Sequence, residues 1–369
     1  MGEYITKTQC QQLLFMLFYG TLTVGKALCL SAGDDALSLI TFFATILLGL
    51  KMLMDDWTKR EFLIALVFAA LTGVIFLFSR RTGIIILSLT LMGAKNIDID
   101  VALRFTFAVR LAIFVGYAVA YVTKITTPAL FIDMRMGKFV EKHDFGFGTN
   151  PNQVSVLIFT LCALYLYCRA NRRNIIDYIC AAGACLTVYS GTKSRSLLLA
   201  MAFLIATLII FKCRPAKKLA RKLAPALFLV INVGACVAAV IYMTFGALMS
   251  GVNALLQNRI TLAADALKIF GLTLLGRQMP SDEFVVDIAY VHSLIQYGLI
   301  FYVWFIYEQF RSVKALFKTK NVDAAALMLA FAVYGIGEEF IYNPIMNVSL
   351  LFVGKNMYDR LKRISDKGL

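Results

Sequence analysis

The sequence predicts an all-α, polytopic integral membrane protein with about twelve transmembrane helices (about 10 to 12). Of its 369 residues, 60% are hydrophobic and only 16% are charged, which lies far from the composition of a soluble domain. Apolar runs long enough to cross roughly 30 Å of hydrocarbon recur along the whole chain. We therefore expect a single polytopic membrane domain over residues 1–369, without a cleavable signal peptide.

Polar or basic connections divide the apolar runs into twelve segments. In chain order we expect them at about residues 11–31, 35–54, 61–79, 82–95, 100–122, 152–169, 174–190, 195–212, 223–246, 288–308, 323–338 and 342–355. The fourth and the last are short for a full crossing, which favours a tilted or re-entrant course. The eight cysteines include no CxxC pair and there are only two histidines, so we expect neither a disulfide framework nor a metal site.

The distribution of basic residues predicts the orientation. Five basic connections fall on one side if both termini are cytoplasmic: Lys51–Arg60, Arg169–Arg173, Lys212–Lys222, Arg311–Lys320 and the tail from Lys355. We therefore expect a multi-pass protein of the cytoplasmic membrane. The net charge of +15 is then mainly a topology signal and does not indicate nucleic-acid binding.

Several cations depart from this topology signal and fall on the opposite, outer face. They are Arg80 and Arg81, Lys193 and Arg195 in the Gly191–Ser196 turn, and Arg259 and Arg277 in the long connection 247–287. Cations gathered on one face indicate a site for an anionic ligand, although Arg80, Arg81 and Arg277 could instead reach lipid phosphates. We expect residues 247–287 to form the large extracytoplasmic loop. Its helical spacing predicts one or two amphipathic helices, broken at Gly271, Gly276 and Pro280, that act as a lid or as a surface anchor.

The order of these turns resembles that of the O-antigen and capsular polysaccharide polymerases (Wzy type) and the related O-antigen ligases. The resemblance covers about residues 145–305 and rests on Gly148-Thr149-Asn150-Pro151-Asn152, Lys193-Ser194-Arg195-Ser196, Asn258-Arg259-Ile260 and a polar motif eleven residues before Gly298. That motif begins at Asp287, where ligase-like members have His. Tyr290 fits the Asp-Asn-x-Tyr form of polymerases, and His292 lies five residues on, about 140° further round a helix.

The resemblance implies a GT-C-like glycosyltransferase bundle that polymerises undecaprenyl-diphosphate-linked oligosaccharides into a capsule, exopolysaccharide or O-antigen on the outer face of the membrane. Arg195 and Arg259, supported by Lys193 and Arg277, would hold the diphosphate leaving group. Asp287 or His292 would act as the base. Asn150, Asn152 and Tyr290 would contact substrate. No cofactor is expected, and the partners are membrane lipid, the lipid-linked oligosaccharide, a flippase and a chain-length regulator.

Simpler interpretations stay open for most of these residues. Asp287 could cap a helix, Asn150 and Asn152 could do the same, and Arg259 could pair with Asp265 or lipid phosphate. His292 could be an ordinary buried histidine. At the level of function, ligase-type transfer to another acceptor, a lipid-linked oligosaccharide flippase or transporter, and a non-catalytic scaffold are the alternatives.

Overall fold

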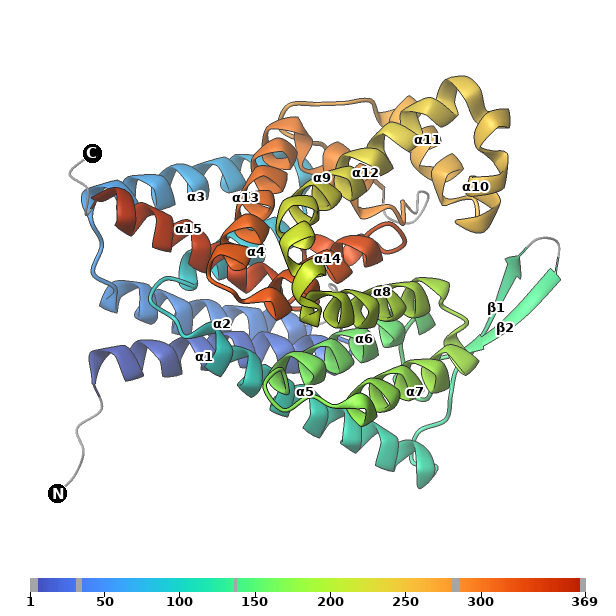
Figure 1. Ribbon diagram of the computed structural model, residues 1–369, viewed down its shortest axis with the longest axis horizontal. Coiled ribbons are helices and arrows are strands. Elements are labelled where there is room, and N and C mark those ends of the chain that lie inside the picture. The colour runs from blue at the N-terminus through green and yellow to red at the C-terminus, as the bar shows by residue number, and fades with distance from the viewer. Residues whose placement is uncertain (1–5, 31–34, 136–137, 281–285, 366–369) are drawn as a thin grey trace. The chain divides into compact units, whose positions relative to one another are not determined.

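The computed structural model is nearly all helical and describes residues 6–30, 35–135, 138–280 and 286–365 (Figure 1). The chain divides into two compact units. The first comprises residues 1–57 and 89–202, and the second comprises residues 58–88 and 203–369. Two helices, α4 (Gly83–Gly93) and α8 (Arg195–Lys212), belong partly to each unit.

The first unit is a layer of long apolar helices. Its helices are α1 (Lys7–Ala27), α2 (Asp35–Met54), α5 (Ile99–Val122), α6 (Pro151–Cys168) and α7 (Ile175–Thr192). Helix α1 packs against α2 and α5, α5 packs against α6, and α6 packs against α7. Helix α6 is buried along most of its length, and within this unit it lies between α5 and α7 in the chain of contacts.

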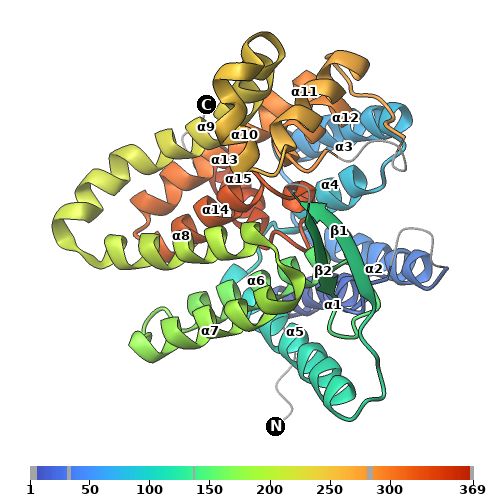
Figure 2. The same cartoon turned by 90° about the vertical axis from the view of Figure 1, so that its right-hand side faces the viewer.

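A β-hairpin joins α5 to α6. Strands β1 (Leu130–Arg135) and β2 (Lys138–His143) pair antiparallel, with Leu130 opposite His143 and Ile132 opposite Glu141 (Figures 1 and 2). The sequence did not predict these strands. Apolar residues occur on both faces of the ribbon, so the alternation that marks a half-buried strand is absent.

The second unit is organised around α9 (Arg214–Phe245). This helix contacts α11 (Arg259–Phe270), α12 (Ala289–Gln296), α13 (Gly298–Lys318) and α14 (Val322–Tyr334). The unit also contains α3 (Lys59–Ser79), η1 (Gly246–Met249), α10 (Ser250–Leu255), η2 (Glu339–Tyr342) and α15 (Leu350–Ser365). Arg360 on α15 donates two hydrogen bonds of 2.9 Å to the Glu308 carboxylate on α13, and this bidentate pair joins the two helices.

Seven helices in the described residues are long and apolar enough to cross a membrane. They are α2, α3, α5, α6, α7, α8 and the stretch from Lys218 to Leu255. Helices α4 and α14 are apolar but shorter. The helical membrane class is therefore supported, whereas the expected count of about twelve spans is not established. The short helices expected in 247–287 are present as η1, α10 and α11, and residues 281–285 of that connection lie outside the described residues.

Several expected segments differ from the structure; α9, for example, begins at Arg214 and not at the expected residue 223. The segment expected at 342–355 is helical only from Leu350, because Asn343 Oδ1 accepts the backbone N–H groups of Ile345 and Met346 and holds a turn there. The segment expected at 288–308 is interrupted at Gly298, which has a φ of +84°. A Cβ at Gly298 would lie 2.3 Å from the backbone nitrogen of Gly276, so two chain segments meet there backbone to backbone.

We expect Gly298→Ala to lower the thermal unfolding midpoint of the detergent-purified protein. The methyl group both meets the Gly276 backbone and strains a positive φ, which costs more than about 1 kcal/mol. Gly234→Ala is the matched control, because nothing lies within 4 Å of a Cβ at that position in α9; it should leave the midpoint unchanged or raise it. Equal midpoints for Gly298→Ala and the wild type would contradict the close approach.

Candidate functional site

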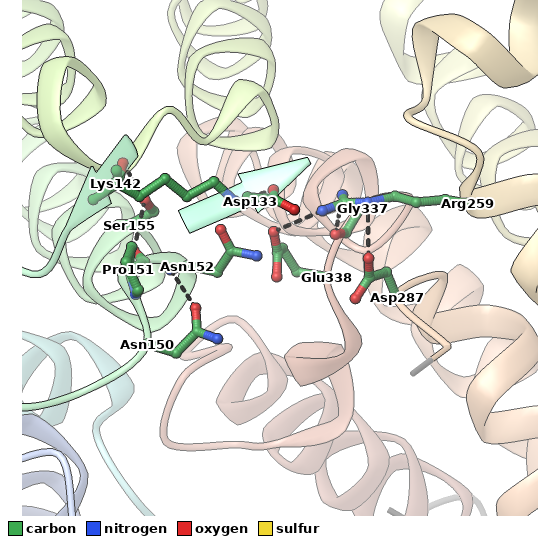
Figure 3. Close-up of polar contacts among 11 residues, drawn as sticks. Asp133, Lys142, Asn150, Pro151, Asn152, Ser155, Arg259, Asp287, Gly337 and Glu338 are labelled. Atoms are coloured by element: carbon green, nitrogen blue, oxygen red, sulfur yellow. Dashed lines mark hydrogen bonds and ion pairs between the residues drawn. The ribbon is translucent and has the colours of Figure 1, made fainter. Parts of the chain in front are cut away.

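Arg259 is the centre of a buried ionic cluster in the second unit. It is the first residue of α11 and is 9% exposed. Its Nε lies 3.0 Å from Asp287 Oδ2, its Nη2 lies 3.3 Å from Glu338 Oε1, and its Nη1 donates to the Gly337 carbonyl (Figure 3). One guanidinium therefore ties the start of α11 to the segment before α12 and to the loop after α14.

In this cluster a single arginine contacts two carboxyl groups. Glu338 is 8% exposed. Burial raises its pKa to about 7; the Asp287 and Glu339 carboxylates act in the same direction and Arg259 opposes them. Glu338 can therefore gain or lose a proton near neutral pH, and it does so beside a fixed cation. This combination is characteristic of functional carboxyl groups.

The N-cap interpretation of Asp287 is not confirmed, because the cap position of α12 is Ile288 and no side chain caps it. Among the described residues, Asp265 pairs with Lys268 at 3.9 Å and not with Arg259. The sequence placed Arg259 and Asp287 on one face without predicting that they touch. The structure brings them into direct contact.

A second polar pair lies in the same unit. His292 on α12 is buried, and its Nε2 lies 3.3 Å from Glu339 Oε2. Arg81 is within electrostatic reach of His292. Arg81, His292 and Glu339, three residues far apart in the sequence, are therefore neighbours.

Two other expected site residues serve the fold in this structure. Tyr290 is fully buried, and its hydroxyl donates a 2.5 Å hydrogen bond to the Ala332 carbonyl. Arg277 is exposed and donates to the Phe270 carbonyl, which closes the turn after α11. An expected contact with substrate stays a prediction for both residues.

The Lys193 and Arg195 turn lies in the first unit. Lys193 caps α7 in the left-handed conformation, with a φ of +54°, and Arg195 is the exposed first residue of α8. Gly191 lets this turn approach the end of β2, because a Cβ there would lie 2.3 Å from His143 Cε1. The 124–151 connection and the 191–196 turn were expected on one face, and they meet at His143.

Asp144 organises the rest of that connection. It is fully buried, and its carboxylate accepts the backbone N–H groups of Ala129, Gly146 and Thr149 at 2.8, 3.0 and 3.1 Å. Asn150 caps α6 by accepting the backbone N–H of Asn152 at 2.9 Å (Figure 3). The capping interpretation of Asn150 is confirmed, and a substrate contact for Asn150 or Asn152 stays a prediction.

Comparison with known proteins gives no relative. No protein-family model, curated protein or solved structure matches the chain significantly. The resemblance to polysaccharide polymerases and ligases therefore stays a hypothesis based on the order of motifs. No group of three or more potential metal ligands occurs among the described residues.

Sequence reasoning missed Glu338 as a member of the Arg259 cluster. The available signal was the pair Glu338-Glu339 directly after an apolar segment, where two acidic residues are costly unless something pairs with them. The partner is 79 positions away in the chain, so spacing alone could not identify it.

We expect the stability of the protein to fall as the pH rises through about 7, because of Glu338. The pKa of Glu338 is raised in the folded state, so the folded state holds the proton more tightly than the unfolded state does. The resulting contribution to stability is fully present below about pH 4.5 and is lost above about pH 7. Across that range the effect is on the order of 3 kcal/mol. Thermal unfolding of the wild type and Glu338→Gln between pH 5 and 8 measures it.

As the pH rises over this range, the wild type should lose stability and Glu338→Gln should lose less. Asp265→Asn is the control, because Asp265 is a half-exposed carboxylate on α11 that does not act on Glu338, and this variant should retain the wild-type dependence. Parallel curves for the wild type and Glu338→Gln would contradict the raised pKa.

Proposed function

We propose that this protein polymerises undecaprenyl-diphosphate-linked oligosaccharide repeat units into a surface polysaccharide on the outer face of the cytoplasmic membrane. The observation that carries the proposal is the buried contact of Arg259 with Asp287 and Glu338 in a helical membrane protein. The reaction needs a fixed cation for a diphosphate leaving group and a carboxylate for an acceptor hydroxyl, and this cluster holds both.

The chemistry assigns a role to each group. The acceptor hydroxyl oxygen attacks the anomeric carbon of the donor sugar, the bond from that carbon to the diphosphate oxygen breaks, and the electron pair leaves with the diphosphate. Arg259 stabilises the charge that develops on the leaving group. Glu338 accepts the hydroxyl proton, since a general base works best with a pKa near the working pH. Asp287 keeps the guanidinium oriented.

Asp287 and His292 stay candidates for the base. Asp287 contacts Arg259 directly, and an Asp at this position fits the polymerase form of the motif. The His292–Glu339 pair supplies the kind of oriented histidine expected of a ligase. Ligase-type transfer is therefore the second candidate function, and a flippase or transporter role is the third.

We expect Arg259→Lys to reduce polymer formation by about 10²–10³-fold. Lysine keeps the charge but lacks the planar guanidinium, which can donate hydrogen bonds to two partners at once. The measurement is the length of lipid-linked glycan in cells that produce the variant at wild-type levels in the membrane. Single repeat units should accumulate. Lys268→Ala is the control on the same helix, since Lys268 is half-exposed and makes only a 3.9 Å pair with Asp265.

Normal long polymer with Arg259→Lys would refute the assignment of Arg259. In the same assay, Glu338→Gln, Asp287→Asn and His292→Ala separate the three base candidates, and loss of the true base costs about 10²–10⁴-fold. A loss confined to His292→Ala would favour the ligase-type reaction.

A further inference from the structure

The end of α14 receives one of its hydrogen bonds from another helix. The last four carbonyl groups of a helix lack partners within it and need donors from elsewhere. The three residues that follow α14 donate their backbone N–H groups to three of these carbonyls, those of Phe331, Val333 and Tyr334. The fourth carbonyl, that of Ala332, accepts the Tyr290 hydroxyl at 2.5 Å in a buried contact. Tyr290 on α12 therefore completes the cap of α14.

A second hydrogen bond joins the same two elements. The Ala289 backbone N–H, one position before Tyr290, donates to the Gly335 carbonyl at 2.9 Å. Gly335 also leaves room for the tyrosine, because a Cβ there would lie 3.1 Å from the Tyr290 hydroxyl oxygen and 2.8 Å from Ile341 Cδ1. The first two residues of α12 thus hold the chain at the point where it leaves α14.

The chain that leaves α14 leads directly to the Arg259 cluster. Gly337 and Glu338 follow the last residue of α14 by three and four positions, and both contact the Arg259 guanidinium (Figure 3). Asp287, three residues before Tyr290, contacts the same guanidinium at 3.0 Å. Both carboxyl groups of the cluster therefore belong to short segments that the Tyr290 hydrogen bond holds together.

We propose that Tyr290 is a positioning residue for the Arg259 cluster. Its hydroxyl acts through the Ala332 carbonyl and fixes the place where Glu338 meets the guanidinium, and it does not itself contact the reacting atoms. A phenylalanine ring would fill nearly the same space, so the hydroxyl is needed for this bond and not for packing. The placement of Glu338 is independent of the proposed function, and only its effect on polymer formation rests on that function.

Tyr290→Phe tests this placement, because it removes the hydroxyl and keeps the ring. The readout is the pH at which Glu338 titrates in the folded, full-length protein in detergent. It is obtained between pH 5 and 8 from the difference in thermal unfolding midpoint with and without a second substitution, Glu338→Gln. The charged groups that act on Glu338 are Arg259, Asp287 and Glu339, and all three stay in place.

We expect Tyr290→Phe to lower the pH of this titration by about one unit relative to the wild type. Burial is the main cause that raises the pKa of Glu338, and a loop released from α12 brings its carboxyl group closer to water. Gly335→Ala should act in the same direction with the tyrosine intact, because the added methyl group crowds the Tyr290 hydroxyl.

Tyr302→Phe is the matched control. Tyr302 is also a buried tyrosine of the second unit, and its hydroxyl donates to a backbone carbonyl, that of Asn232, at 3.1 Å. Loss of this hydroxyl should lower the unfolding temperature and leave the titration of Glu338 where the wild type has it. A purely structural role of a buried tyrosine hydroxyl is thereby separated from a positioning role.

An unmoved titration in Tyr290→Phe, or an equal shift in Tyr302→Phe, would overturn the inference. Under the proposed function, Tyr290→Phe should also reduce polymer formation by up to about 10²-fold, because a displacement of about 1 Å can cost that much. Loss of polymer with an unmoved titration would reject positioning in favour of a direct substrate contact. A shifted titration, together with a wild type that makes no polymer, would retain the positioning role and reject the proposed function.

Discussion

The contact of Arg259 with Asp287 and Glu338 is the interaction on which the second unit depends. A buried charge without a partner is costly, and removing one member of a buried pair typically costs about 3–5 kcal/mol. Here one guanidinium holds three connections that are far apart in the sequence. The nearby glycine contact between Gly276 and Gly298 lets the chain turn tightly between α11 and α13. The ionic contact holds the chain just before α12, where Asp287 stands, and the close backbone approach holds the chain at the end of α12.

Much of the helical pattern could be predicted because apolar length decides it. The segments expected at 35–54, 195–212 and 100–122 correspond to α2, α8 and α5 within one residue at each end. The hairpin could not be predicted, because Phe131 and Val140 make its second face apolar as well. Glu338 could not be assigned to Arg259 either, since nothing local signals a partner 79 residues away. Patterns of nearest neighbours identify helices, whereas long-range polar contacts depend on the tertiary fold.

The candidate site residues separate according to whether the fold already uses their polar atoms. The Asn150 side chain caps α6, and the Tyr290 hydroxyl is bonded to a backbone carbonyl inside the second unit. Each of these two polar side chains is therefore explained by its role in the fold. The second carboxyl group on Arg259 has no comparable reason, because a second buried acid on one cation destabilises a fold. Residues that cost stability in this way are the better indicators of function.

The sharing of Arg259 between two carboxyl groups also has a consequence for the proposed reaction. Before the chemical step, the two carboxyl groups share the arginine, so its charge is largely satisfied. When the acceptor hydroxyl gives its proton to Glu338, that carboxyl group becomes neutral. Its ionic interaction with the Arg259 guanidinium then weakens. This happens as negative charge develops on the leaving diphosphate. Arg259 would then interact more strongly with the transition state than with the bound substrate, which is the condition for lowering the barrier. A pKa near 7 makes the exchange possible, because Glu338 can hold or release a proton near neutral pH at little cost.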